Sequence, residues 1–267
     1  MKTYKHFFGF EKEAFPQDIL LKDIYPVPGL AALFDRFMFA VDLCSVSVIT
    51  GEVGSGKSTS LRYAVSKLHP SEYQIVQVIA NTGTYVEVLR QIASGLALDI
   101  CVSSISKLSG SIRQILLEIT ERKIKPVIII DEAHLLRLEV FAQIHTLFEF
   151  EFDSKPIAPV ILCGQKNLID SLSYHKCRSL ASRIIGRSHL DGLVLEDMRS
   201  YLKHHLEIAG IKQQLFSDEA IIAIHQGSGG LLRRANFLAK GGLFAAFKGK
   251  SNVVSAEHIR IAATEII

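Results

Sequence analysis

One segment limits the fold more than any other. The β-branched run Val46-Ser-Val-Ile-Thr50 leads into Gly51-Glu-Val-Gly-Ser-Gly-Lys57-Ser58, and a helical pattern follows through Leu68. A strand, a glycine-rich loop and a helix in this order are the context in which a loop binds phosphate groups. Glycine takes positive φ without steric cost, so Gly51, Gly54 and Gly56 let the backbone approach an anion closely. A plain glycine-rich turn before a helix is the simpler alternative.

The remaining residues of this loop give the expected ligand a definite chemistry. Lys57 supplies positive charge for β- and γ-phosphates, and Ser58 Oγ is a ligand for Mg²⁺. We therefore expect a nucleoside triphosphate, ATP with Mg²⁺, to be held by these residues: Gly51, Val53, Gly54, Ser55, Gly56, Lys57, Ser58, Thr59 and Asp131. Ser58 and Asp131 are the expected metal ligands.

A second motif, Val127-Ile-Ile-Ile-Asp131-Glu132, is an apolar strand that ends in two carboxylates. Asp131 would hold Mg²⁺ opposite Ser58, and Glu132 would act as a general base on the attacking water. Taken alone, Asp131 caps a helix equally well. After a phosphate-binding loop and at the end of a strand, the catalytic interpretation is favoured. Asn81, which ends the second predicted strand, is a candidate hydrogen-bond partner of Glu132, with a simple turn as the alternative.

Three further polar residues are candidates for the same site. Gln165 ends the run Val160-Ile-Leu-Cys-Gly-Gln165 and is placed to orient water or contact the γ-phosphate, or simply to form a turn. Arg183 is a candidate for reaching the γ-phosphate of a neighbouring copy and stabilising transition-state charge. Arg233 is a candidate for folding back onto the phosphates and reporting the state of the nucleotide to the second domain. Surface salt bridges are the alternative for both arginines.

The alternation of patterns predicts the fold. Apolar runs at 46–50, 75–80, 127–131 and 160–163 alternate with helical patterns at 57–68, 84–98, 108–122 and 139–152. This alternation favours a parallel sheet with helices on both faces. After about residue 190 only helices are expected, at 195–209, 217–225, 231–247 and 255–266. We predict an α/β domain over 1–190, which includes an N-terminal arm laid over the core, and a small all-helical domain over 191–267.

Composition is that of an ordinary globular chain, with 48% hydrophobic and 21% charged residues and a net charge of +3. A charge this small neither requires nor excludes a nucleic-acid partner. The sequence contains neither a signal peptide nor an apolar stretch of membrane-spanning length. Cys44 and Cys163 lie beside or in apolar strands, and both are expected to be buried, reduced thiols. We expect a soluble, cytoplasmic protein without a membrane partner.

These strings, in this order, resemble AAA+ ATPases of the ExeA-like group, which includes transposition-helper ATPases of the TniB, TnsC and MuB type. The likeness covers nearly the whole chain. It includes Tyr4-x-x-Phe-Phe-Gly-Phe, the phosphate loop, Asp131-Glu-Ala-His134, Leu162-Cys-Gly-Gln165, Ser182-Arg-Ile184, Tyr201-Leu-x-x-His-Leu-Glu-x-Ala-Gly210 and Ser228-Gly-Gly-x-x-Arg-Arg-x-Asn236. The resemblance implies an AAA+ P-loop NTPase fold with a helical lid domain. It also implies that Gln165 is sensor 1, Arg183 the arginine finger with Arg178 in reserve, and Arg233 sensor 2.

The resemblance further implies a function. Secretion members of the group carry a membrane span and a cell-wall-binding region that this sequence lacks, which favours a transposition regulator. Such a protein would oligomerise as rings or filaments on double-stranded DNA without strong sequence preference, mark the target site and recruit transposase. Hydrolysis would then disassemble it. Lys107, Arg113 and Lys123 are the expected DNA contacts, although each alone suits a solvated helix face. An ExeA-like secretion ATPase and an initiator- or loader-like ATPase are the alternatives.

Overall fold

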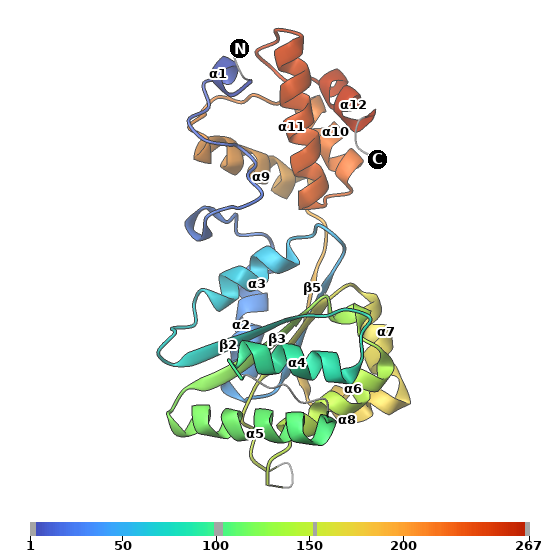
Figure 1. Ribbon diagram of the computed structural model, residues 1–267. Coiled ribbons are helices and arrows are strands. Elements are labelled where there is room, and N and C mark those ends of the chain that lie inside the picture. The colour runs from blue at the N-terminus through green and yellow to red at the C-terminus, as the bar shows by residue number, and fades with distance from the viewer. Residues whose placement is uncertain (1–3, 99–103, 152–153, 265–267) are drawn as a thin grey trace. The chain divides into compact units, whose positions relative to one another are not determined.

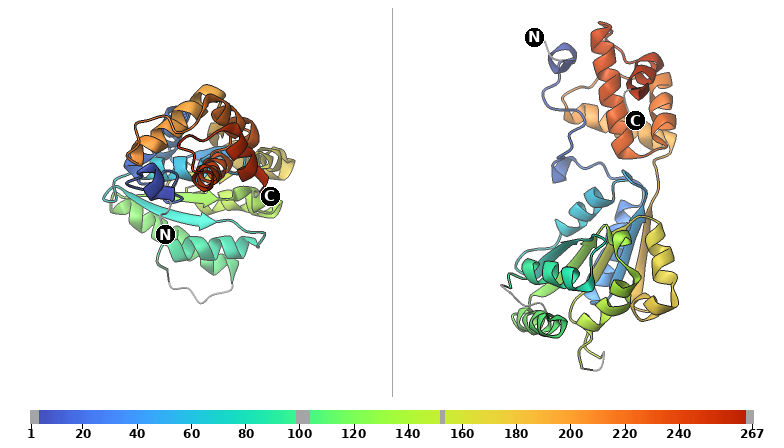
Figure 2. Two further views of the ribbon diagram at one scale, coloured as in Figure 1. Left: turned by 90° about the horizontal axis from the view of Figure 1, so that it is seen from above. Right: turned by 45° about the vertical axis from the view of Figure 1, so that its right-hand side comes forward.

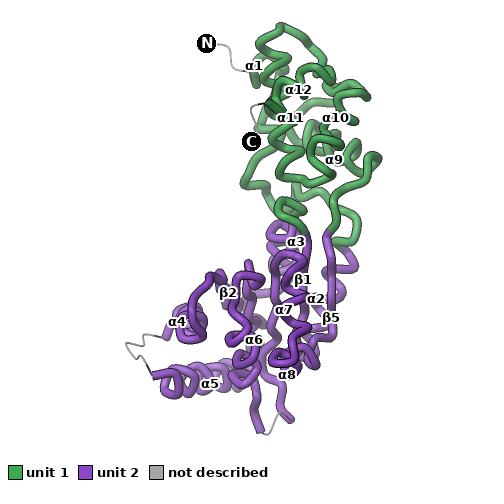
Figure 3. The backbone as a smooth tube through the Cα atoms, turned by 90° about the vertical axis from the view of Figure 1, so that its right-hand side faces the viewer, with its two compact units in different colours: residues 1–30, 52–56, 191–267 green, residues 31–51, 57–190 purple. Residues whose placement is uncertain are grey.

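The computed structural model describes residues 4–98, 104–151 and 154–264. The chain divides into two compact units (Figure 3). We call residues 31–51 and 57–190 the sheet unit, and residues 1–30, 52–56 and 191–267 the lid unit. The predicted division at residue 190 stays a prediction. In the structure, however, residues 4–30 group with the C-terminal helices and not with the sheet.

The sheet unit is built on five parallel strands in the order β2-β3-β4-β1-β5 (Figure 1). They are β1 Val46–Gly51, β2 Tyr73–Ile79, β3 Lys125–Asp131, β4 Val160–Gly164 and β5 Ile184–Leu190. The sequence-based prediction of a parallel sheet is confirmed, but β5 was missed. Its burial alternates, and its outward residues include Arg187 and His189, so it does not read as an apolar run.

Helices cover both faces of this sheet (Figures 1 and 2). α2 Leu30–Asp42 and α3 Lys57–Val65 lie on one face. The other face is covered by α4 Tyr85–Gly95, α5 Ile105–Glu121, α6 Leu138–Ile144, α7 Asn167–Ser173 and α8 Arg178–Ala181. On that second face, buried residues of α4 and α5 such as Leu89, Ile92 and Ile112 pack in one core with Val76 and Ile128 of the strands. Such burial is the main stabilising term.

Among its described residues, the sheet unit also contains three short 3₁₀ turns: η2 Ala133–Leu135, η3 His145–Phe148 and η4 His175–Cys177. The predicted helix over 139–152 is shorter than expected, because α6 gives way to η3 at His145. α4 begins with a capping box, in which the Thr84 backbone N–H donates to Glu87 Oε2 at 2.8 Å.

The lid unit contains the four predicted helices: α9 Leu195–Ile208, α10 Asp218–Ser228, α11 Leu232–Lys248 and α12 Ala256–Thr264. Glycine and capping residues mark the ends of three of these helices. Gly210 follows α9 with φ of 88°, and Ser217 Oγ accepts from the Ala220 N–H at the start of α10. The Ser255 N–H donates to His258 Nδ1 at 3.0 Å before α12.

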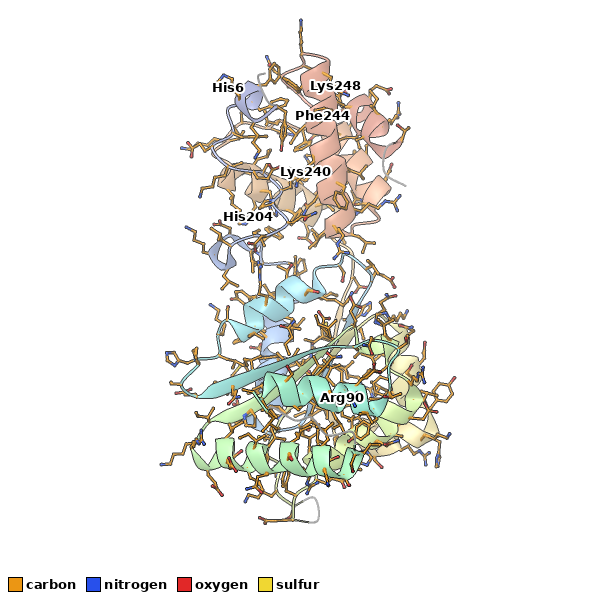
Figure 4. All side chains as sticks on the ribbon, in the orientation of Figure 1. His6, Arg90, His204, Lys240, Phe244 and Lys248 are labelled. Atoms are coloured by element: carbon orange, nitrogen blue, oxygen red, sulfur yellow. The ribbon has the colours of Figure 1, made fainter. Side chains whose placement is uncertain are left out.

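The N-terminal arm, with α1 Tyr4–Phe8 and η1 Leu21–Asp23, is bonded to α9. His205 Nδ1 donates to Ala14 O at 2.9 Å and His204 Nε2 to Asp23 O at 2.8 Å (His204 is labelled in Figure 4). The Glu11 N–H donates to Ala209 O. Two adjacent histidines of α9 therefore donate hydrogen bonds to backbone carbonyls of the arm and hold it within the lid unit.

Buried His205 makes the stability of the lid unit depend on pH. Burial lowers the pKa of His205 to about 4, whereas an unfolded histidine has a pKa near 6.5. Its stabilising contribution is thus full above pH 6.5 and is lost as the pH falls toward 4. We expect about 2 kcal/mol of unfolding free energy to be lost between pH 7 and pH 5.

Urea unfolding at both pH values checks this expectation. His205→Asn keeps a side-chain N–H for Ala14 O but does not titrate, so it should lose most of the pH dependence. His6→Asn, at an exposed position, is the control and should unfold as the wild type does. An equal pH dependence in His205→Asn would contradict the assignment.

Candidate functional site

The phosphate loop, residues 51–58, connects β1 to α3. Gly54 has φ of 85° and Gly56 has φ of 97°, so both adopt a conformation that other residues take only at a cost. Space restricts both positions as well. A Cβ on Gly54 would lie 2.9 Å from Arg233 Cβ, and one on Gly56 would lie 3.0 Å from Leu232 Cδ1. Gly51 differs from expectation, because it ends β1 as a strand residue and needs no positive φ.

The loop has the features that a polyphosphate requires. Ser55 Oγ is buried and has no hydrogen-bond partner among the residues that the structure describes. Lys57 is 8% exposed, and its Nζ donates to Gly51 O at 2.9 Å. A buried polar atom without a partner is uncommon and is satisfied by an added acceptor. Because α3 begins at Lys57, the amides of its first turn are also suited to bind an anion.

The acidic motif lies at the same edge of the sheet. Val127 to Ile130 of β3 are buried, and Asp131 and Glu132 follow at its carboxyl end. β4 lies between β3 and β1, with Ile130 opposite Leu162 and Leu162 opposite Val48. Parallel strands end at one edge, so Gly51, Asp131 and Gln165 are brought together from three distant parts of the sequence. Gln165 is partly buried just after β4.

Asp131 has two close neighbours. Its Oδ1 accepts from the Glu132 N–H at 2.9 Å. Cys163, which is fully buried on β4, lies on its other side, and burial together with the Asp131 carboxylate strongly raises the pKa of the thiol. Cys163 is a free, buried thiol, as the sequence predicted, whereas Cys44 is a free thiol but is only partly buried. A neutral, buried thiol is unreactive, so it contributes shape and a weak donor to this carboxylate.

Arg183 lies at the opposite edge of the sheet. It precedes β5, and its O accepts from the N–H of Val46, the first residue of β1. Five residue steps along β1 separate that edge from Gly51, roughly 17 Å at 3.3 Å per residue. The side chain is 27% exposed and its Nη2 forms an ion pair with Glu149 Oε1 at 2.8 Å. Arg178, the reserve candidate, is exposed at the start of α8.

Arg233 lies in the first turn of α11 and is exposed. Within the lid unit its backbone N–H donates to Gly54 O at 3.2 Å. The sequence suggested Arg233 as a sensor through its guanidinium, whereas this contact is made by its backbone. This contact lies within the lid unit, because Gly54 and Arg233 both belong to it. The sensor role of Arg233 stays a prediction.

The basic residues expected to contact DNA differ in their availability. Lys107 and Lys123 are exposed. Arg113 is held by its own chain, since Nη1 donates to Thr146 O at 2.7 Å and the guanidinium lies 4.4 Å from the centre of the Phe150 ring. This reduces its capacity to bind a phosphate.

Sequence reasoning missed two residues near these groups, His134 and Glu149. His134 Nδ1 lies 3.4 Å from Glu132 Oε2. Glu149 is the ionic partner of Arg183. His134 was visible within the motif Asp131-Glu-Ala-His134 but was given no role, and no sequence pattern connects Glu149 with Arg183.

Comparisons with known proteins agree with this architecture. Residues 41–172 match the AAA domain family. The chain is 32% identical over 272 residues to the General secretion pathway protein A of Aeromonas hydrophila, across 98% of this chain and 48% of that protein. The chain therefore spans about half the length of this curated relative. Among the described residues, no helix is long and apolar enough to cross a membrane.

Solved structures share the fold at low sequence identity. Cdc6p from Pyrobaculum aerophilum is 12% identical with a TM-score of 0.75, over 95% of this chain and 70% of that one. The Aeropyrum pernix ORC1 protein, solved in complex with DNA, is 16% identical with a TM-score of 0.71, over 96% of this chain and 70% of that one. At these identities the likeness concerns the fold alone.

Proposed function

Because this chain belongs to the ExeA-like group of AAA+ ATPases, we propose that it is an ATP-driven regulator of transposition that assembles on double-stranded DNA. ATP with Mg²⁺ favours an oligomeric ring or filament on DNA, which marks a target site and recruits transposase. Hydrolysis then releases the assembly. The protein's output is a platform for recruitment and not a modified DNA.

The position of Arg183 supports the part of this proposal that requires an oligomer. Asp131 is the last residue of β3 and Glu132 follows it, while Arg183 precedes the amino end of β5 in the same parallel sheet. A guanidinium there lies too far from its own chain's carboxylates to stabilise charge on the nucleotide between them. It is suited to the nucleotide of a neighbouring copy, so hydrolysis requires assembly.

The other residues divide the work within one copy. The loop amides, Ser55 and Lys57 hold the phosphates, and Ser58 with Asp131 holds Mg²⁺. Bound Mg²⁺ neutralises charge on the phosphates. Glu132 accepts the proton of the attacking water. Gln165 orients that water, and Arg233 reports the state of the nucleotide to the lid unit.

Charge on the lid unit supports DNA as the partner. Residues 220–256 contain no Asp or Glu but include Arg233, Arg234, Lys240, Lys248 and Lys250. Lys240 and Lys248 lie along α11 with the exposed ring of Phe244 (Figure 4). Lys240 is 3.8 Å from Glu13, which leaves Arg234, Lys248 and Lys250 as the more exposed cations. They add to the predicted DNA contacts, which were Lys107, Arg113 and Lys123.

Binding of fluorescent double-stranded DNA with a non-hydrolysable ATP analogue, with ADP and without nucleotide tests the proposal. We expect affinity only with the ATP analogue, a steep loss of affinity with added salt, and rings or filaments by electron microscopy. Replacing Arg234, Lys248 and Lys250 by alanine should weaken binding by about tenfold at moderate salt. The matched Lys107→Ala/Lys123→Ala variant shows whether the basic residues of the sheet unit or those of the lid unit contribute more to DNA affinity. No binding in any nucleotide state would reject DNA as the partner.

The 32% identity to a General secretion pathway protein A along nearly the whole chain favours a second candidate, a secretion-associated assembly ATPase. Such a protein would form nucleotide-dependent complexes with a membrane protein and would leave DNA unbound. An initiator- or loader-like role is supported by fold alone. The protein found on DNA after assembly distinguishes a transposition regulator from a loader. A regulator of this kind itself coats the DNA, whereas a loader deposits another protein on it.

A further inference from the structure

Glu132 has an unusual backbone conformation. It follows β3 with φ of 54° and ψ of 29°, in the left-handed region that non-glycine residues rarely adopt. Residues held in this way cost free energy and cluster at functional sites. The turn that follows, η2, brings the next ionisable residue, His134, back beside the Glu132 side chain. The backbone therefore directs the two side chains toward each other.

His134 is held firmly. Its side chain is 7% exposed, whereas that of Glu132 is 46% exposed. It packs on Gly164, where an added Cβ would lie 3.0 Å from His134 N and 3.3 Å from Nδ1. Gly164 directly precedes Gln165, so the imidazole sits between the Glu132 turn and the strand end that carries Gln165. The buried His134 imidazole is therefore suited to fix the position of the half-exposed Glu132 carboxylate.

The nitrogen that faces Glu132 lacks an aligned partner. His134 Nδ1 lies 3.4 Å from Glu132 Oε2, yet it forms no hydrogen bond with any residue that the structure describes. Buried nitrogens are seldom left in this state. A small rotation of the exposed Glu132 side chain, with the proton on Nδ1, satisfies both groups.

We propose that His134 is a positioning residue for hydrolysis. Its Nδ1–H donates to Glu132 and holds that carboxylate where it accepts the proton of the attacking water. The inference rests on the proposed role of Glu132 as the general base. Asn81, the residue that the sequence suggested as a partner of Glu132, instead accepts from the Gly83 N–H at 2.9 Å. Positioning alone changes turnover and leaves ATP affinity unaltered.

Two isosteric substitutions separate this role from simple packing. The amide nitrogen of asparagine can occupy the place of Nδ1, whereas that of glutamine reaches the place of Nε2. ATP hydrolysis by the full chain, with DNA where DNA stimulates it, gives kcat and KM, and a fluorescent ATP analogue gives the affinity. We expect His134→Gln and His134→Leu to lower kcat about tenfold with little change in KM, because a displaced base loses rate in this range.

His134→Asn should recover a large part of wild-type kcat. Equal kcat values for the asparagine and glutamine variants would overturn the proposal, since packing alone does not distinguish them. A higher KM at unchanged kcat would overturn it as well. Thermal unfolding of each variant verifies that the compared chains are folded.

A double-mutant cycle tests whether His134 acts through Glu132. In a Glu132→Gln background, His134→Leu should produce no further loss of residual turnover. If the losses of turnover caused by Glu132→Gln and His134→Leu multiply in the double variant, His134 does not act through Glu132. If Glu132→Gln itself hydrolyses ATP normally, the base assignment fails and this inference fails with it. If Glu132→Gln is inactive but the asparagine and glutamine variants match, only the positioning role is rejected.

Discussion

Replacing Lys57 with alanine is expected to weaken nucleotide binding strongly and to abolish ATP turnover at ATP concentrations that saturate the wild type. Lys57 is 8% exposed at the start of α3, and its Nζ is held at the end of β1 by Gly51 O. An ammonium group in this partly desolvated position makes a charge-assisted contact with phosphate worth about 3 kcal/mol, so affinity should fall by about 100-fold or more. Titration with a fluorescent ATP analogue measures the loss directly.

The control for this variant is Lys203→Ala. Lys203 lies in α9 with a side chain that is 74% exposed. Its replacement removes the same charge without touching the phosphate loop, so affinity should stay at the wild-type value. Circular dichroism of both variants confirms that each remains folded. Retention of wild-type affinity by Lys57→Ala would show that this loop does not hold the nucleotide.

Replacing Arg183 with alanine is expected to lower turnover by about 10³-fold, the scale of an arginine finger, while each copy still binds ATP. The structure holds this guanidinium at the amino edge of the sheet, paired with Glu149 at 2.8 Å. Loss of the ion pair alone could also disturb the chain. Glu149→Gln serves as the control, because it removes the ion pair yet keeps the guanidinium, and it should preserve most of the turnover.

Mixing two inactive variants tests whether Arg183 acts on a neighbouring copy. Arg183→Ala retains Glu132, and Glu132→Gln retains Arg183, so a mixed oligomer contains sites with both groups intact. Mixing should therefore restore a substantial part of the ATPase activity. If Arg183 acted within its own chain, no mixture would recover activity. The same result would hold if Arg183 had only a structural role.

Much of the fold and part of the site were predictable because their signals are local. The phosphate loop and the Asp131-Glu132 motif each occupy a few consecutive residues, and apolar runs mark β1, β3 and β4. Strand β5 escaped because an edge strand is covered less completely, so polar residues such as Arg187 interrupt its pattern. The end of α6 at Ile144 was also unpredictable, since η3 continues the same apolar spacing.

Pairings between distant residues were not predictable. Arg183 meets Glu149, and His204 and His205 meet the carbonyls of Asp23 and Ala14, across separations that no local pattern records. Asn81 was a reasonable partner for Glu132 by strand position, but a turn to Gly83 engages its side chain. His134 occupies the place beside Glu132 because a left-handed residue reverses the chain there.

The sequence by itself determined the chemistry of this protein: a glycine-rich loop with Lys57 and Ser58, and a strand that ends in two carboxylates. These features depend on backbone freedom and side-chain type within a few consecutive residues, so the sequence alone shows them. Only the tertiary structure decided which groups meet. The parallel sheet placed Gly51, Asp131 and Gln165 at the carboxyl ends of its strands and Arg183 at the amino end. Parallel strands bring their carboxyl ends together regardless of their separation along the chain.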